Sequence, residues 1–145
     1  MMLGILLLVI EDSKMNVFDK LIMATLLACP MGAWAGDLYV VANAGVNLAE
    51  GEVRDVFLGD KQMAGAIRLV PIDNASTQKE FLEKVIKIDA SKYGAVWTKK
   101  GFRDGLNAPA VKSGDAEVLA FVRGTPGAVG YVRSKPTGVT IIEKY

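Results

Sequence analysis

The stretch PIDNASTQKEFLEKV, residues 71–85, runs from an apolar segment through a small polar turn into a helical pattern. Thr77 and Glu80 have the spacing of a capping box, in which each side chain bonds the backbone amide of the other residue. The residues after the turn recur at helical spacing on one side. These apolar residues are Phe81, Leu82, Val85, Ile86 and Ile88. The pattern predicts a strand that ends at the turn and a helix that begins after Thr77.

Strand and helix patterns alternate through the rest of the chain. Pro71 is expected at the end of its strand, where no backbone donor is needed, and Ser113 is expected to cap a helix. The predicted strands are 37–44, 65–73, 128–134 and 138–145, the predicted helices are 47–60, 77–87, 89–102 and 114–124, and 103–114 is a predicted loop. This alternation predicts an α/β domain with a mixed sheet flanked by helices.

The first 35 residues have the features of a targeting segment. An apolar run at 21–35 follows Lys20 and ends in AWA, with small residues at Ala33 and Ala35, as in signal-peptide cleavage sites. Met15 stands where such a peptide would begin. We therefore expect 1–14 to be an upstream start-site extension, 15–35 a signal peptide and 36–145 the folded domain, with an uncleaved anchor as the alternative.

Cysteine usage fits either outcome of processing. The chain has one cysteine, Cys29, inside the apolar run. The sequence LLAC around it loosely matches a lipoprotein box, so lipidation at Cys29 is the alternative to cleavage after Ala35. Cleavage would leave a chain without any thiol or disulfide.

Charge and composition narrow the classes of function. Residues 36–145 contain 15 Lys and Arg against 13 Asp and Glu, dispersed along the sequence, which gives no indication of a nucleic-acid partner. The chain has no histidine, and it carries no nucleophile elbow or phosphate-binding loop motif. We therefore expect no enzyme, no catalytic residues, no cofactor and no metal site, and we interpret acids such as Asp73 as ordinary surface charge.

Several segments together resemble a known family. EVRDVFLGDKQ, the turn leading to STQKEF, and EVLAFVRGTPGAVGYV stand in the order and spacing of phosphate-type periplasmic solute-binding proteins. The resemblance covers nearly all of 38–143 and is most specific at 57–59 and 126–132. The chain resembles the short, single-domain members of this class, which are related to the substrate-binding proteins of phosphate ABC transporters.

The resemblance implies a fold and a mode of binding. It implies a single lobe of the type 2 periplasmic-binding-protein fold, whose full-length members close two lobes over a tetrahedral anion. Because 36–145 supplies about one lobe, the opposing face would come from a homodimer or another protein. It also implies a periplasmic location and a membrane transporter or envelope protein as partner.

The resemblance also implies ligand-binding residues. Full-length members hold the anion with an Arg and a Gly-Ser-Gly-Thr turn, and the matching positions here are Pro71 and then Asn74, Ala75, Ser76 and Thr77. The Arg is therefore lost, whereas amides at a helix N-terminus can still bind an anion. The alternative is a capped helix with no ligand.

Two further turns are weaker candidates. Asn43 and Gly45 lie in a small-residue turn where a ligand could approach the backbone, although ordinary turn chemistry explains them equally. Asp115 in SGD, residues 113–115, would repel an anion and is interpreted as part of a helix start. Lys99, Lys100 and Arg103 form a basic group that is either a solvated helix end or a surface for an anionic partner.

Two functions remain open from the sequence. The first is an exported solute-binding-like protein that binds phosphate or a related oxyanion at the Asn74–Thr77 turn. The alternative is an interaction module of the cell envelope that kept the fold and lost the ligand.

Overall fold

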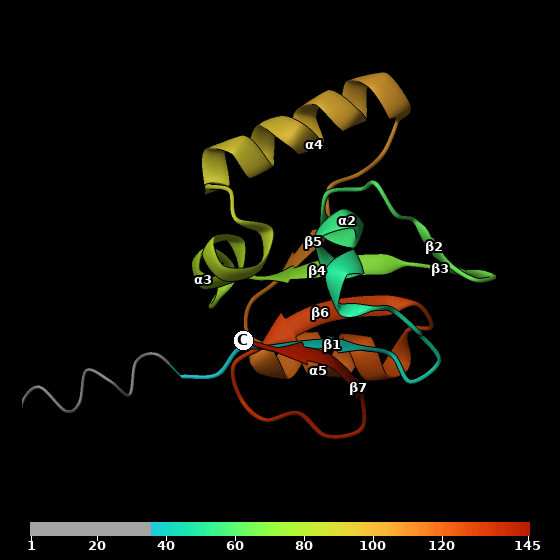
Figure 1. The fold of residues 1–145 in the computed structure, drawn as a ribbon, viewed down its shortest axis with the longest axis vertical. Coiled ribbons are helices and arrows are strands. Elements are labelled where there is room, and N and C mark those ends of the chain that lie inside the picture. Colours follow the sequence, from blue (N-terminus) through green and yellow to red (C-terminus); the bar gives the residue numbers. More distant parts are fainter. Residues whose placement is uncertain (1–35) are drawn as a thin grey trace, which may run out of the picture. The chain divides into compact units, whose positions relative to one another are not determined.

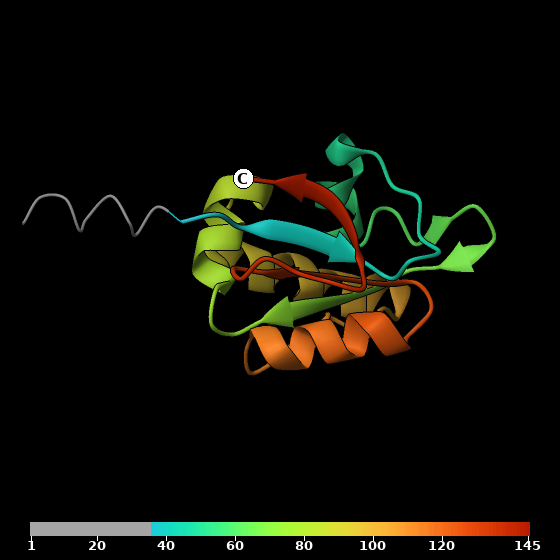
Figure 2. The same cartoon turned by 90° about the horizontal axis from the view of Figure 1, so that it is seen from below.

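The computed structural model describes residues 36–145, so the predicted signal peptide, the possible upstream extension and Cys29 lie outside the described residues. Within the described part, no helix combines the length and hydrophobicity needed to cross a bilayer. Figure 1 shows the arrangement of the elements, and Figure 2 shows the same domain turned by 90°.

A mixed five-stranded sheet forms the centre of the domain, in the order β5-β4-β6-β1-β7. β4 is parallel to both β5 and β6, whereas β1 is antiparallel to both β6 and β7. The strands of this sheet are β1 (Tyr39–Ala42), β4 (Val70–Asn74), β5 (Ala110–Lys112), β6 (Ala128–Val132) and β7 (Thr140–Lys144). The prediction of an α/β domain with a mixed sheet flanked by helices is confirmed.

Helices cover both faces of the sheet (Figure 2). α5 (Asp115–Gly124) packs on one face. The other face carries the 3-10 turn η1 (Glu50–Glu52), α2 (Val53–Phe57), α3 (Gln78–Phe81), the π-helical turn η2 (Leu82–Ile86) and α4 (Ala90–Asp104). A separate two-stranded hairpin consists of β2 (Met63–Ala64) and β3 (Ile67–Arg68).

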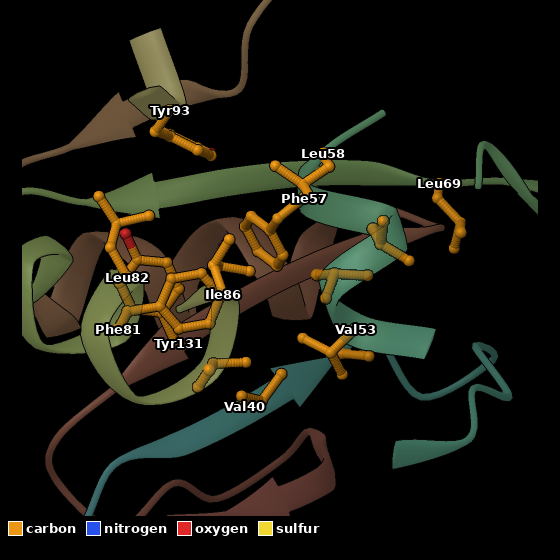
Figure 3. Close-up of a cluster of buried hydrophobic side chains, with 14 of the residues drawn as sticks. Val40, Val53, Phe57, Leu58, Leu69, Phe81, Leu82, Ile86, Tyr93 and Tyr131 are labelled. Atoms are coloured by element: carbon orange, nitrogen blue, oxygen red, sulfur yellow. The ribbon is translucent and has the colours of Figure 1, made fainter. Parts of the chain in front are cut away.

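Alternation of side chains along the inner strand β1 divides the core between these layers. In β1, Val40 and Ala42 face the larger cluster while Tyr39 and Val41 face α5, as the two-residue period of a strand requires. In the larger cluster, the rings of Phe81 and Tyr131 stack with centroids 3.8 Å apart, and Phe57 meets Phe81 edge-on at 4.8 Å (Figure 3). These rings join β6 to the helical layer.

Several local predictions differ from the structure. Pro71 lies inside β4 instead of at its end, because β4 continues to Asn74 by pairing with β6 and then with β5. The predicted 103–114 loop contains β5, and the predicted strand at 65–73 is divided between β3 and β4. The helix after Thr77 forms, but its second half winds as a π-helix and ends at Lys87, with φ of 65°.

Gly130 sets the distance between β6 and α5. A Cβ at this position would lie 2.8 Å from Val118 Cγ1, closer than side chains approach one another. We expect Gly130→Ala to lower the free energy of unfolding by about 1–3 kcal/mol through overpacking, measured by urea denaturation. Gly94→Ala is the matched control, because its Cβ would meet nothing within 4 Å and helix propensity favours Ala. Equal losses in both variants would contradict this account.

Candidate functional site

The side chain of Asn74, the last residue of β4, is buried at the start of the predicted binding turn. Its Nδ2 donates to Asp115 Oδ1 at 2.8 Å and to the Tyr131 carbonyl at 2.9 Å. Its Oδ1 accepts from the Ser76 amide at 3.0 Å and from Ser76 Oγ at 2.7 Å. Both polar atoms of the Asn74 side chain are therefore hydrogen-bonded within the protein.

The backbone amides of the turn are also engaged within the chain. The Ala75 amide donates to the Lys112 carbonyl at 2.8 Å, and the Thr77 amide donates to the Asn74 carbonyl at 3.1 Å. The Ser76 amide is held by Asn74 Oδ1. An anion at this turn would therefore compete with the Lys112 carbonyl, the Asn74 carbonyl and Asn74 Oδ1 for these three amides.

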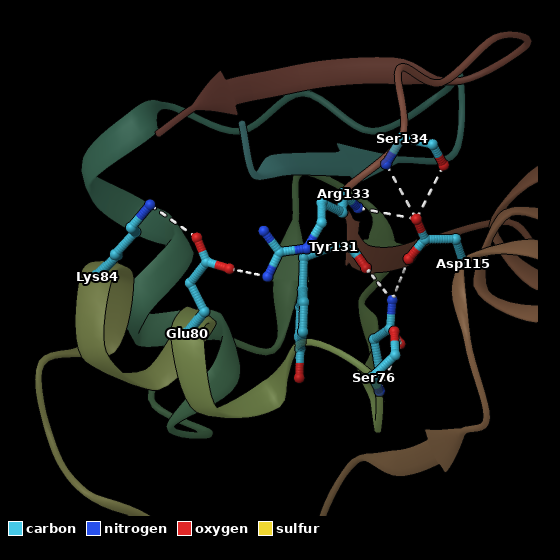
Figure 4. A network of polar contacts seen from close by, with 8 residues as sticks. Ser76, Glu80, Lys84, Asp115, Tyr131, Arg133 and Ser134 are labelled. Atoms are coloured by element: carbon cyan, nitrogen blue, oxygen red, sulfur yellow. Dashed lines mark hydrogen bonds and ion pairs between the residues drawn. The ribbon is translucent and has the colours of Figure 1, made fainter. Parts of the chain in front are cut away.

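Thr77 begins the helix without capping it. Thr77 is only 4% exposed, and its Oγ1 has no hydrogen-bond partner among the described residues. The predicted capping box is therefore wrong, since Glu80 instead pairs with Lys84 at 2.7 Å and with Arg133 (Figure 4). Those ion pairs draw the Glu80 carboxylate away from the Thr77 backbone.

The second predicted pair, Asn43 and Gly45, lies at the opposite end of the sheet. The Asn43 amide donates to the carbonyl of Ala128, where β6 begins, and Asn43 Nδ2 donates to the carbonyl of Val122 near the end of α5. The Gly45 amide donates to Asn43 Oδ1 at 3.3 Å. Asn74 instead contacts the end of β6 and the start of α5, so the structure does not bring the two sets of residues together.

Asp115 is the residue around which the polar groups converge. Its Oδ2 accepts from the Arg133 amide at 3.0 Å, the Ser134 amide at 3.0 Å and Ser134 Oγ at 2.8 Å (Figure 4). Its Oδ1 accepts from Asn74. Consecutive backbone amides that point at one acceptor are a common way to bind an anion, and here the chain's own carboxylate occupies that position.

The ionisation of Asp115 follows from these contacts. Burial raises the pKa of its carboxyl group, but the hydrogen bonds from Ser134, Asn74 and Arg133 together outweigh burial and hold the pKa below its ordinary value of 3.8. The carboxylate is therefore charged at neutral pH.

The expectation that Ser113 caps α5 is wrong, because the capping position is Gly114 and no side chain caps the helix.

A second carboxylate belongs to Asp73, the residue before Asn74 in β4. It is 2% exposed and accepts hydrogen bonds from Tyr93 at 2.9 Å and Tyr131 at 2.8 Å. Burial raises the pKa of the Asp73 carboxyl group, and the tyrosine hydrogen bonds oppose that rise. The interpretation of Asp73 as surface charge is wrong. A tyrosine within an apolar run such as AVGYV, residues 128–132, is a sequence signal for a buried polar partner, since a buried tyrosine hydroxyl usually finds one.

The charges around the turn are thus mainly negative. Asp73 precedes Asn74 in β4, Asp115 accepts a hydrogen bond from the Asn74 side chain, and the nearby Arg133 is paired with Glu80. Within residues 36–145, no group of three or more acidic or thiol side chains could hold a metal ion.

Comparisons with known proteins give a likeness in structure but none in sequence. No protein-family model matches the chain, and neither does any curated protein. The crystal structure of PstS from Borrelia burgdorferi is similar with a TM-score of 0.44 at 15% sequence identity, over 66% of this chain. This chain spans 39% of the length of that protein.

Replacing Asp115 tests whether its charge stabilises the contacts that join the start of α5 to Asn74, Arg133 and Ser134. We expect Asp115→Asn to lower the free energy of unfolding at neutral pH by about 1–3 kcal/mol, since hydrogen bonds to a charged acceptor are lost. The lowered pKa means that the contribution of Asp115 is present above pH 3.8 and is lost as the pH falls through the pKa of the folded state. Urea denaturation across acidic pH should show the two proteins converging.

Asp104→Asn is the matched control, because Asp104 is an exposed acid whose side-chain partner is its neighbour Arg103. A second variant, Asp115→Ala, would leave the donors of Asn74, Arg133 and Ser134 facing an empty space. Added formate should then raise the melting temperature of Asp115→Ala more than that of the unmodified protein. An identical response of the two proteins would contradict the inference that the amides of Arg133 and Ser134 form an anion-binding site that the Asp115 carboxylate occupies.

Proposed function

We propose that the chain is an exported, single-lobe domain of the type 2 periplasmic-binding-protein class that acts as a protein-interaction module of the cell envelope. The observation that carries this proposal is the internal use of the turn: the amides of Ala75, Ser76 and Thr77 all donate within the chain. The resemblance of the sequence to phosphate-type solute-binding proteins supports the choice of class.

Electrostatics favours this function over oxyanion binding. The guanidinium that full-length members place near the turn is replaced by Pro71, which lies within β4. The ionised Asp115 bonds to Asn74 at 2.8 Å, so a phosphate at the turn would meet a like charge. Without the charge-assisted arginine bonds, little remains to offset that repulsion.

Exposed apolar side chains support an interaction role. Phe102 on α4 is 88% exposed and Val111 on the edge strand β5 is 59% exposed. Single apolar residues are common on protein surfaces, but an exposed aromatic side chain on a helix is a typical anchor at a protein interface.

The binding of phosphate or a related oxyanion is the second candidate, with a membrane transporter as the partner. It is favoured by the Thr77 hydroxyl, which is buried without a partner in the described part of the chain. Buried polar atoms are rarely left unpaired, and an anion oxygen would satisfy this one.

Export rests on the sequence alone. We propose that 15–35 is a signal peptide removed after Ala35, which would deliver 36–145 to the periplasm as one domain. Sequencing the N-terminus of the protein recovered from the periplasm tests this, since a chain that begins at Gly36 supports cleavage and a lipid-modified Cys29 contradicts it.

A thermal-shift titration separates the two functions. We expect millimolar phosphate or sulfate to leave the melting temperature of the protein unchanged, because a ligand that binds the native state must raise it by mass action. Thr77→Val removes the buried hydroxyl at nearly constant volume, and Thr98→Val, at an exposed position on α4, is the matched control. A rise with phosphate that only Thr77→Val abolishes would establish oxyanion binding instead.

A further inference from the structure

Most of the surface of α4 is not used by the fold. The helix has 15 residues, and only Tyr93 and Trp97 are buried. Trp97 donates from its indole nitrogen to the Phe57 carbonyl at 3.1 Å, and Tyr93 donates to Asp73. Figure 1 shows α4 at the margin of the helical layer, above α2 and α3. Tyr93 and Trp97, with the half-buried Val96, therefore hold the helix in place, and its other sides remain available.

A groove with an apolar floor runs along one of these sides. Its volume is about 430 Å³, and it lies between α4 and the segment that joins α2 to Gly59. The apolar residues that line it are Leu58, Ile88, Ala95 and Val96. Leu58 is buried, while Ile88 and Val96 are half-buried against the core. The floor is therefore recessed and fixed by the packing beneath it.

The rim of the groove is positively charged. Its charged residues are Arg54, Lys92, Lys99, Lys100 and Arg103, and no acidic residue is among those that line it. Lys92, Lys99 and Arg103 are separated by seven and then four positions, which places them along one side of a helix. In residues 36–145 as a whole, acids nearly balance bases, so five cations around one groove are a local concentration of charge.

Part of this charge is held in place by the protein. Lys100 pairs with Asp60 at 2.5 Å, and Arg103 pairs with Asp104 at 3.3 Å. Arg54 uses its Nε to donate to the Ile86 carbonyl at 2.9 Å, and it also lines a neighbouring pocket with Glu50 and Glu143. Within the described residues, Lys92 and Lys99 form no ion pair. The rim therefore presents a net positive field above an apolar surface.

From this combination we propose that the groove along α4 binds an acidic, amphipathic segment of a partner protein. Carboxylates of the segment would pair with Lys92, Lys99 and Arg103, while its apolar side chains would enter the groove over Val96. The proposal rests on the proposed interaction function and names the surface and the chemistry of its partner.

The shape of the surface favours a peptide over a lipid bilayer. A bilayer surface is approached best by apolar side chains that project beyond the cations, whereas Leu58 and Val96 lie below the rim. A small oxyanion would find no buried polar side chain among those that line the groove. Phe102 does not line the groove, but it is exposed on α4 beside Arg103 in the sequence, where a bound segment that extends beyond the groove can contact it.

The test uses a defined probe and charge-reversal variants of the whole protein. The probe is a fluorescent helical peptide of about 15 residues, matched to the length of α4, with Glu on one face and Leu on the other. We expect binding, measured by fluorescence anisotropy, to weaken as salt is raised and to weaken about tenfold or more in the Lys99→Glu, Arg103→Glu double variant. A peptide with Lys in place of Glu should not bind.

Two further variants separate the groove from general charge effects. Lys135→Glu with Lys144→Glu changes the net charge equally at exposed positions outside the groove, and it should bind the acidic peptide as the unmodified protein does. Ala95→Phe fills the groove without changing a charge, and it should weaken binding. Circular dichroism checks that each variant is folded.

The contradicting results are distinct. Equal affinity in both charge-reversal variants, or no binding of the acidic peptide, would overturn the assignment of the groove while leaving the interaction function in place. Binding to vesicles of anionic lipid without binding to the peptide would overturn it in favour of a membrane. A dimer that the Lys99→Glu, Arg103→Glu variant dissociates, again without peptide binding, would assign the groove to a second copy. Phosphate stabilisation that depends on Thr77 would instead overturn the interaction function itself.

Discussion

The hydrogen bonding of the buried Asn74 side chain is the constraint on which the arrangement around the turn depends. A buried amide that loses its partners costs free energy, and the partners of Asn74 come from Ser76, from Tyr131 in β6 and from Asp115 in α5. The same contacts fix the end of the inner strand β4, the direction of the following helix and the position of α5 on the other face. The Asn74 side chain engages the amide and hydroxyl of Ser76, while the amides of Ala75 and Thr77 donate to the backbone carbonyls of Lys112 and Asn74. A small anion would therefore compete with the protein's own acceptors for the donors of this turn.

Much of the architecture follows from local sequence patterns. β1, α5, β6 and β7 lie within the segments predicted for them. β1 and β6 are buried on both faces and so form short continuous apolar runs in the sequence. β5 could not be found in this way, since its three residues form a strand only by pairing with Ile72–Asn74. The π-helical turn after Phe81 was equally hidden, because the spacing of Leu82, Val85 and Ile86 fits an ordinary helix as well.

The site was less predictable than the fold because its partners are distant in the sequence. The polar turn at Asn74–Thr77 was identified from its residues, but whether its amides are free depends on Lys112 and Asp115, which local patterns do not connect to it. Asp115 illustrates the difficulty: an acid in the first turn of a helix is usually explained by the helix dipole, and nothing near it in the sequence indicates that Arg133 and Ser134 will enclose its carboxylate.

The sheet order has a consequence for how the domain is made. β1 lies between β6 and β7, and the backbone groups of Leu38 and Tyr145 bond to one another in both directions. β1 thus has no neighbouring strand until β6 and β7, within residues 128–144, have been synthesised, and such long-range pairing slows folding. Until then the apolar residues of β1 cannot be buried within the sheet, and the five-stranded sheet is complete only when β7 has paired with β1.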